Sequence, residues 1–297
     1  MAIETLVKTV FSDTFRDEVW EDLNAGKLMS SEFKQHIKFG DEVDCQFHDT
    51  VTLGDYTGVD LDPDTAQVAS TTTVKVKIDK GKSVLFRLDE QKVRQIESAK
   101  TNAEKEKLIR EYSNDTREQF LRAIDKACCG EVVRAGHTIT NSGSAITATK
   151  TNMLDIFQAA KIALKEGDGQ GHTAWFDGEM IAVINSHLEG FLSTQNLLQY
   201  SDVMAKNYKK GYKGELLGFN IVVDDNLFKD NDGYVYPMFG RSKRTIAGGI
   251  QDDFEIESAK KVGGFDTYYW GRGVFGVKAP LSYLLCTAKL NAQFTVS

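Results

Sequence analysis

The segment 71–88, TTTVKVKIDKGKSVLFRL, most constrains what this chain can fold into. Its first half alternates apolar and basic residues, the pattern of a β-strand with one apolar and one charged face. The run 83–88 is a second β-rich segment, and the glycine-containing link 79–82 predicts a hairpin turn between the two. A two-stranded hairpin is barely stable alone, so we expect this hairpin to need a partner surface. Its apolar side chains are Val74, Val76 and Ile78, and the lysines between them are Lys75 and Lys77.

Charge is distributed unevenly around this segment. Residues 1–70 hold 5 basic and 15 acidic side chains, net −10, whereas residues 71–88 hold 5 basic and 1 acidic, net +4. An acidic segment followed by a basic one suggests complementary contact within or between subunits. The whole chain, with 36 basic and 43 acidic side chains, has a net charge of −7. A protein that grips duplex DNA through phosphates usually has the opposite balance.

Length and composition are those of an ordinary globular protein. The 297 residues, 41% of them hydrophobic, suffice for one large domain or two modest ones. No run of 18 apolar residues exists and the first residues carry no apolar signal region, so we expect no membrane contact and no secretion. The four cysteines form no CxxC pair, which favours reduced thiols in a cytosolic setting.

The remaining pattern mixes helices and strands without strict βαβ alternation, which predicts an α+β fold. Residues 1–46 carry an apolar stripe at helical spacing within an acidic arm, and 47–70 is expected to be an extended loop. A short helix is expected at 90–99 and a long charged helix at 103–128, after a capping box at Thr101–Glu104. Further expected elements are a helix from Leu154 to Gly167 capped by Asn152, strands within 173–185, 214–228, 234–239 and 274–286, and a helix opening at Ser186.

No motif predicts catalytic, cofactor or metal chemistry. Gly271–Gly276 matches GxGxxG, but Pro280 and the short remaining chain exclude the βαβ unit that a dinucleotide site requires. Cys45 and His48 have a metal-like spacing without a second pair. We therefore expect no catalytic residues, no bound cofactor and no metal.

The order of features resembles the tailed-bacteriophage major capsid protein family, which has the Hong-Kong-97-like fold. An acidic arm precedes the segment IDKGKSVLFRLDE and a long charged helix ending in FLRAIDKACCG. Later come GELLGFNIVVDDNL and, near the end, GRGVFGVKAP. Each segment alone is weakly specific, but the three occur in the family's order and span nearly the whole chain.

The resemblance implies a division into five parts. These are an N-terminal arm at 1–46, an extended β-hairpin loop at 47–88, a spine helix and the start of a peripheral domain at 89–139, an axial domain at 140–234, and return strands of the peripheral domain at 235–297. It implies a structural subunit, not an enzyme, that self-assembles as pentamers and hexamers into an icosahedral shell around a DNA genome. Its implied partners are itself, separate scaffolding, portal and decoration proteins, and DNA held only non-specifically. The protein would be made in the host cytoplasm and end in the virion.

Contact residues between subunits are expected on the acidic arm and on the basic segment. Two alternatives remain open at this stage. An encapsulin-type nanocompartment shell would share the fold and enclose a cargo enzyme, and a soluble α+β enzyme with a dispersed active site would be monomeric. Some members of the family cross-link a loop lysine to a neighbour's asparagine, for which Lys80 or Lys82 is the candidate. The expected contact residues are Lys75, Lys77, Lys80, Lys82, Arg87, Phe11, Phe15 and Trp20.

Overall fold

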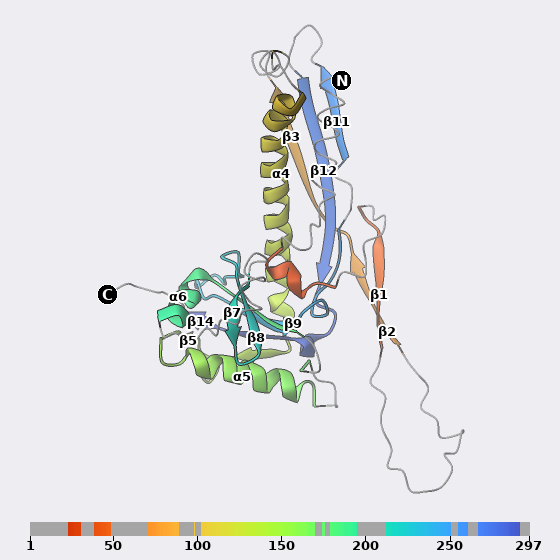
Figure 1. Cartoon of the computed structure of the whole chain (residues 1–297). Helices are drawn as coiled ribbons and strands as arrows, with labels where there is room; N and C mark the ends of the chain where they lie inside the picture. The colour runs from red at the N-terminus through yellow and green to blue at the C-terminus, as the bar shows by residue number, and fades with distance from the viewer. Residues whose placement is uncertain are drawn as a thin grey trace, which may run out of the picture.

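The structure is a computed structural model with an elongated part, a compact body and a two-stranded ribbon (Figure 1). It describes residues 23–30, 39–48, 71–88, 98, 102–169, 174–175, 179–194, 212–250, 255–260 and 267–291.

The elongated part pairs one long helix with a four-stranded antiparallel sheet. Helix α4 spans Asn102–Gly130, as its charged periodicity predicts, and runs along the sheet (Figure 1). Strand β12 is central and pairs with β3 along one edge and with β10 and β11 along the other. On the helix side, Phe86 stacks between Tyr112 and the buried Tyr269. The strands are β3 (Lys80–Leu88), β10 (Ala247–Ile250), β11 (Glu255–Lys260) and β12 (Thr267–Lys278).

The compact body is built on a six-stranded mixed sheet in the order β4-β13-β9-β6-β8-β7. An aromatic cluster joins Phe157 of helix α5 to Phe219 and Phe239 of the sheet, with ring centroids 5.2–6.0 Å apart. The elements are β4 (His137–Ile139), β13 (Leu285–Ala288), β9 (Met238–Arg241), β6 (Met180–Ile184), β8 (Phe219–Val223), β7 (Tyr212–Leu216), α5 (Met153–Glu166) and α6 (Ser186–Thr194). Shorter elements are the pair β5 (Ile146–Thr147) and β14 (Leu290–Asn291), and the 3-10 turns η3 (Glu131–Arg134) and η5 (Ser282–Leu284).

The predicted hairpin between 71–78 and 83–88 is wrong, although both strands exist. Strand β2 (Thr71–Lys77) pairs with β1 (Glu42–His48), whereas β3 pairs with β12. The link 79–82 is not a reversal, because the chain passes from one sheet into the other and β3 already begins at Lys80. The true hairpin is the β1–β2 ribbon, whose connection at 49–70 lies outside the described residues.

The end of the expected N-terminal arm at 1–46 packs into the core of its own subunit. The 3-10 turn η1 (Ala25–Leu28) packs with the main hydrophobic core, and Leu23, Ala25, Leu28 and Met29 are each at most 1% exposed. This stretch of the expected arm is therefore tied into its own subunit. Residues 1–22 lie outside the described part.

The expected domain boundary at 234/235 cuts through one sheet. Strands β9 and β13, expected to return to the peripheral domain, pair within the six-stranded sheet beside β6 and β4. Of the described residues after 234, β10, β11 and β12 alone belong to the sheet beside α4. The expected helix at 90–99 is described at Ser98 alone. Helices α5 and α6 and strand β8 match their predictions, although the Asn152 side chain makes no cap bond to α5.

Candidate subunit-contact surfaces

The β1–β2 ribbon presents acidic and basic side chains on one exposed face. Directly opposite pairs join Glu42 to Lys77 and Asp44 to Lys75, and all four side chains are exposed. Lys75 Nζ lies 3.4 Å from Glu42 Oε2, a diagonal cross-strand ion pair. These lysines were expected to contact a neighbouring subunit. The same chain supplies at least part of the opposing negative charge, through Glu42.

The other face of the ribbon packs on the sheet beside α4. Val76 and Ile78 are 1% and 0% exposed, and they pack with Ala247 and Val274 respectively while Val43 lies against both pairs. The predicted alternation of apolar and charged faces is confirmed. The crossing depends on Gly276, because a Cβ there would overlap the Lys77 carbonyl oxygen and the Ile78 side chain. Gly271–Gly276 thus lies within strand β12 rather than in a phosphate-binding loop.

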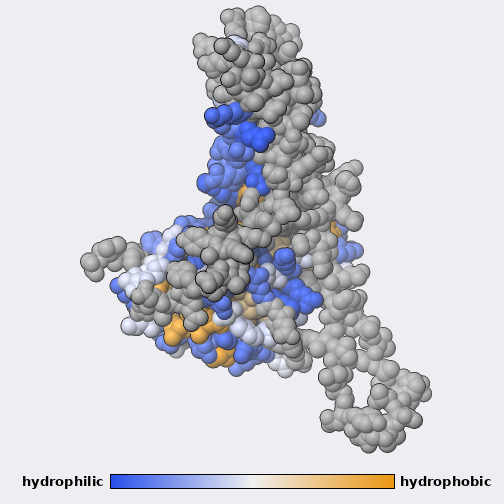
Figure 2. Space-filling model, viewed as in Figure 1, coloured by the Kyte–Doolittle hydropathy of each residue, from blue (hydrophilic) through white to orange (hydrophobic). Residues whose placement is uncertain are grey.

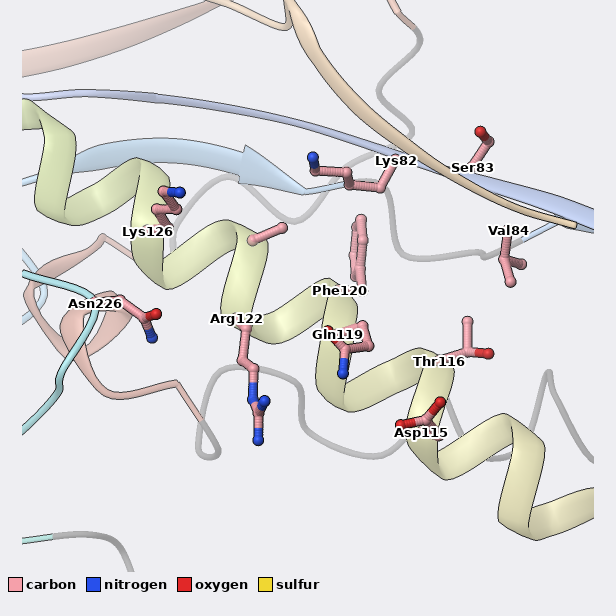
Figure 3. Close-up of a pocket in the computed structure, with 11 residues that line it drawn as sticks. Lys82, Ser83, Val84, Asp115, Thr116, Gln119, Phe120, Arg122, Lys126 and Asn226 are labelled. Carbon is pink, nitrogen blue, oxygen red and sulfur yellow. The ribbon is translucent and has the colours of Figure 1, made fainter.

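Lys80 and Lys82 line a groove between β3 and the lower half of α4. Two adjoining hollows of about 620 and 500 Å³ share Lys82, Ala123 and Lys126, and we call them together the α4–β3 groove. Figure 3 shows Phe120 rising from α4 toward β3 between Lys82 and Val84, while Arg122 points away from β3. Arg122 pairs with Glu118 of the same helix.

A buried junction, which the sequence pattern did not reveal, joins the arm to α4. Asp125 of α4 is 5% exposed and accepts the backbone N–H groups of Asn24 at 3.1 Å and Gly26 at 3.0 Å. Asp224, 4% exposed and directly after β8, accepts the backbone N–H of Asn226 at 2.8 Å. The helix, the arm and the body therefore meet at two carboxylates.

The electrostatics of this junction favour the protonated forms of both acids. Burial first, and then the negative charge of Asp224, raise the pKa of Asp125 from 3.8 to about 7, against the two N–H groups and Lys27. Burial likewise raises the pKa of Asp224, opposed by its bonds to Asn226. An Asp at such a pKa titrates near neutral pH, which no isolated carboxylate does.

The other side chains that could act as nucleophiles or metal ligands are in structural environments, in the part of the chain that the structure describes. Cys128, Cys129 and Cys286 are buried free thiols whose pKa values are raised by burial, to about 12 for Cys286. The Cys45 and His48 side chains lie outside the described set. Within that set no three metal-ligating side chains gather, and no helix has the length and apolarity to cross a membrane.

The structure places the expected contact residues on different surfaces. Lys75 and Lys77 lie on the ribbon, Lys80 and Lys82 at the groove, and Arg87 on the exposed face of β3. Phe11, Phe15 and Trp20 lie outside the described residues. Figure 2 shows the described upper part of α4 as hydrophilic, with orange patches over the lower body. Two apolar side chains of α5, Leu154 and Ile162, are 40% and 46% exposed.

Solved structures similar to this chain include those of phage capsids. A chain of Mycobacterium phage Che8 aligns with TM-score 0.56 and 20% identity over 86% of both chains. The capsid of Ralstonia phage GP4 aligns with TM-score 0.65 and 12% identity over 88% of this chain and 86% of the other. The chain has the phage major capsid fold. This confirms the α+β prediction and the long helix as the spine of that fold.

A third similar structure is the virus-like particle from Pyrococcus furiosus. It aligns with TM-score 0.53 and 10% identity over 97% of this chain and 100% of the other. No protein-family model and no curated protein matches the sequence. The similarity to capsids is therefore a similarity of fold. At these low sequence identities, the comparison of structures detects it and the comparison of sequences does not.

Proposed function

We propose that the protein is the major capsid protein of a tailed phage, which assembles as pentamers and hexamers into an icosahedral shell around DNA. The observation that carries this proposal is the capsid fold over 86% or more of the chain in phage structures. The elements also suit a shell subunit, because the ribbon and the elongated part expose long edges that neighbours can cover. The role is structural rather than catalytic.

Within this proposal, the parts of the chain take the family's roles. Residues upstream of 23 form the arm, the β1–β2 ribbon with 49–70 is the extended loop, and α4 with the sheet of β3, β10, β11 and β12 is the peripheral domain. The six-stranded sheet with α5 and α6 is the axial domain. Scaffolding, portal and decoration proteins are proposed partners, and the net charge of −7 suits a wall that does not trap packaged DNA. Synthesis would be in the host cytoplasm and the final location the virion.

Negative-stain microscopy of the purified protein tests the proposal. We expect closed shells, or hexagonal and pentagonal capsomers. Monodisperse particles the size of a single chain, at all concentrations up to those used for assembly, would contradict it and favour the soluble enzyme.

A nanocompartment shell is the second candidate, favoured by the similarity to the Pyrococcus furiosus particle. Both candidates form shells, so microscopy does not separate them. Genes for a portal and a terminase beside this gene would support the phage capsid, whereas a gene for a cargo enzyme would support the nanocompartment.

A further inference from the structure

The turn η1 is fixed to its subunit by a different kind of bond at each end. At its C-terminal end, the backbone N–H of Lys243 donates to the Lys27 carbonyl at 3.0 Å, and that of Ile246 to the Leu28 carbonyl at 3.0 Å. The Ser30 N–H donates to the Ile246 carbonyl at 2.7 Å. These partners belong to the connection from β9 to β10. Backbone amides do not titrate near neutral pH, so this end of η1 has no proton-dependent bond among them.

The N-terminal end of η1 is held by two carboxyl groups instead. Asp125 of α4 accepts the backbone N–H groups of Asn24 and Gly26, one on each oxygen. The N–H of Ala25, between them, stabilises the ionised form of Asp224, which follows β8. Three successive backbone donors therefore act on two acids that come from different parts of the subunit, the elongated part and the body. We call Asp125 and Asp224 the carboxyl pair.

The site compensates two negative charges poorly. Both acids are buried. Asp224 Oδ1 accepts both hydrogen bonds from Asn226, whereas Oδ2 is buried without a hydrogen-bond partner in the described part of the chain. Charge on a buried oxygen without a partner is costly. Asp225 adds its own negative charge beside Asp224, and the charge of Asp224 in turn disfavours ionisation of Asp125.

The titratable groups around the carboxyl pair do not remove this repulsion. Lys27 of η1 favours the ionised form of Asp125, but its effect is weaker than those of burial and of Asp224. On α4, Cys128 and Cys129 interact electrostatically with both acids, and burial raises the pKa of both thiols, so they stay neutral. A proton on one of the two acids relieves the repulsion directly.

We propose that the carboxyl pair is a pH-dependent switch that holds or releases the N-terminal end of η1. While Asp125 is protonated, residues 24–26 lie against α4 and the end of β8, as in this structure. When both acids are ionised, residues 24–26 leave the pair and water hydrates the two carboxylates. The chain then pivots just before Lys27, because the backbone bonds to 242–246 remain. The switch belongs to a single folded subunit and does not rest on the proposed function.

The direction of the pH dependence follows from the burial of Asp125. Release exposes this carboxyl to water, where its pKa returns from about 7 toward 3.8. The closed form therefore binds the proton more tightly, so closure is most favoured below pH 3.8 and weakens as pH rises through 7. Between these values the ratio of open to closed molecules rises by up to about tenfold per pH unit, and above about pH 7 it levels off.

Hydrogen exchange at single amides of the full-length protein tests the switch. Rates are measured from pH 5 to 8.5, resolved to single residues by fragmentation in the mass spectrometer, and divided by the intrinsic rates of the unfolded sequence. The protection of Asn24 and Gly26 should fall about tenfold or more between pH 5 and 7, and change little above that. Ser30 and Ile246, at the other end of η1, should keep their protection throughout.

Three substitutions separate the switch from a general loss of stability. Asp125→Asn cannot ionise and keeps one oxygen acceptor, so the protection of Asn24 and Gly26 should no longer depend on pH. Asp224→Asn removes the neighbouring charge, so the fall in protection should be smaller and should end at a lower pH. Asp115→Asn changes an exposed acid of the same helix and should leave the wild-type profile unchanged.

Each result decides for or against the switch. Protection of Asn24 and Gly26 that does not depend on pH in the wild-type protein would overturn it. An equal fall at Ser30 would also overturn it, since the whole turn would then open as one unit. If Asp125→Asn does not fold, Asp224→Asn decides, and a wild-type profile in either variant contradicts the proposal. Exchange is measurable on unassembled subunits and on shells alike, so this outcome is separate from that of the microscopy that tests the proposed function.

Discussion

The side chain of Asp125 in α4 accepts the backbone N–H of Gly26 at 3.0 Å, across 99 positions of sequence. A second bond, from Asn24 at 3.1 Å, completes a two-point clamp on the arm. Asn24 precedes η1 and Gly26 lies in its first turn, so neither N–H group has an acceptor within the 3-10 turn. The side chain of Asp125 in α4 therefore caps the arm at the start of η1.

Asp125→Ala should loosen this end of the arm. The two N–H groups would lose their acceptor in a buried site, at a cost of about 1–3 kcal/mol. The expected result at pH 5, where the carboxyl is largely neutral, is a lower urea midpoint and faster hydrogen exchange at Asn24 and Gly26. Asp115→Ala, an exposed change on the same helix, is the control and should do neither. Unchanged exchange at Gly26 in the Asp125 variant would contradict the clamp.

The raised pKa of Asp125 predicts stability that falls as pH rises. The folded protein binds this proton more tightly than the unfolded chain does, with a pKa of about 7 against 3.8. Its contribution is fully present below pH 3.8 and is lost as pH rises through 7, a change of order a few kcal/mol. Asp125→Asn cannot ionise and should flatten this dependence, measured as thermal midpoints of unassembled subunits from pH 4.5 to 8. The idea fails if wild type and variant keep the same slope.

Gly276→Ala should disrupt the crossing of β2 over β12. The new methyl would overlap the Lys77 carbonyl and Ile78, and overpacking of this kind costs about 1–3 kcal/mol. Gly130→Ala is a matched control, because nothing lies within 4 Å of its added Cβ and its backbone is helical. That change should be neutral or stabilise by up to about 1 kcal/mol. Equal effects of the two changes on urea unfolding would contradict the close approach.

Sequence periodicity predicted which faces are buried but not which strands pair. Val76 and Ile78 are inside and Lys75 and Lys77 outside, as alternation requires. Alternation is a property of one strand, however, and carries no information about the neighbour across its edge. The link at Gly81 has turn-like composition, yet glycine is also tolerated in an extended strand, where Gly81 faces Val274 of β12.

The Asp125 junction could not be predicted from the sequence for a related reason. Asp125 lies in a helix with many charged residues, and only its partner 99 positions away distinguishes it from its solvated neighbours. The nearest signal is its phase, since it falls next to the apolar residues Ile124 and Leu121 rather than on the charged side. The spine helix itself was predictable because its capping, length and charge pattern are all local.

Lys75 and Glu42 should respond as a pair to charge reversal. Lys75→Glu places a third acid beside Glu42 and Asp44 on the ribbon, while exposed ion pairs contribute only about 0–1 kcal/mol each. The single change should therefore affect folding little and, repeated in every subunit, lower the yield of assembled particles. Glu42→Lys added to it should restore that yield, measured by sedimentation. A drop in subunit melting temperature with unchanged assembly would show that the ribbon is a folding element instead.

Val222→Asp tests whether β8 is a central strand of the body. Ile221 and Val222 are fully buried, and β8 pairs on both edges, with β6 and β7. An Asp at 222 would bury an unpaired charge opposite Val183, at a cost of several kcal/mol, enough to unfold a domain of ordinary stability. We expect insoluble subunit rather than soluble subunit that fails to assemble. Val133→Asp makes the same substitution at a valine that is 71% exposed and should stay soluble. Recovery of folded, soluble Val222→Asp monomer would show that the sheet tolerates the charge and that β8 does not stabilise the body.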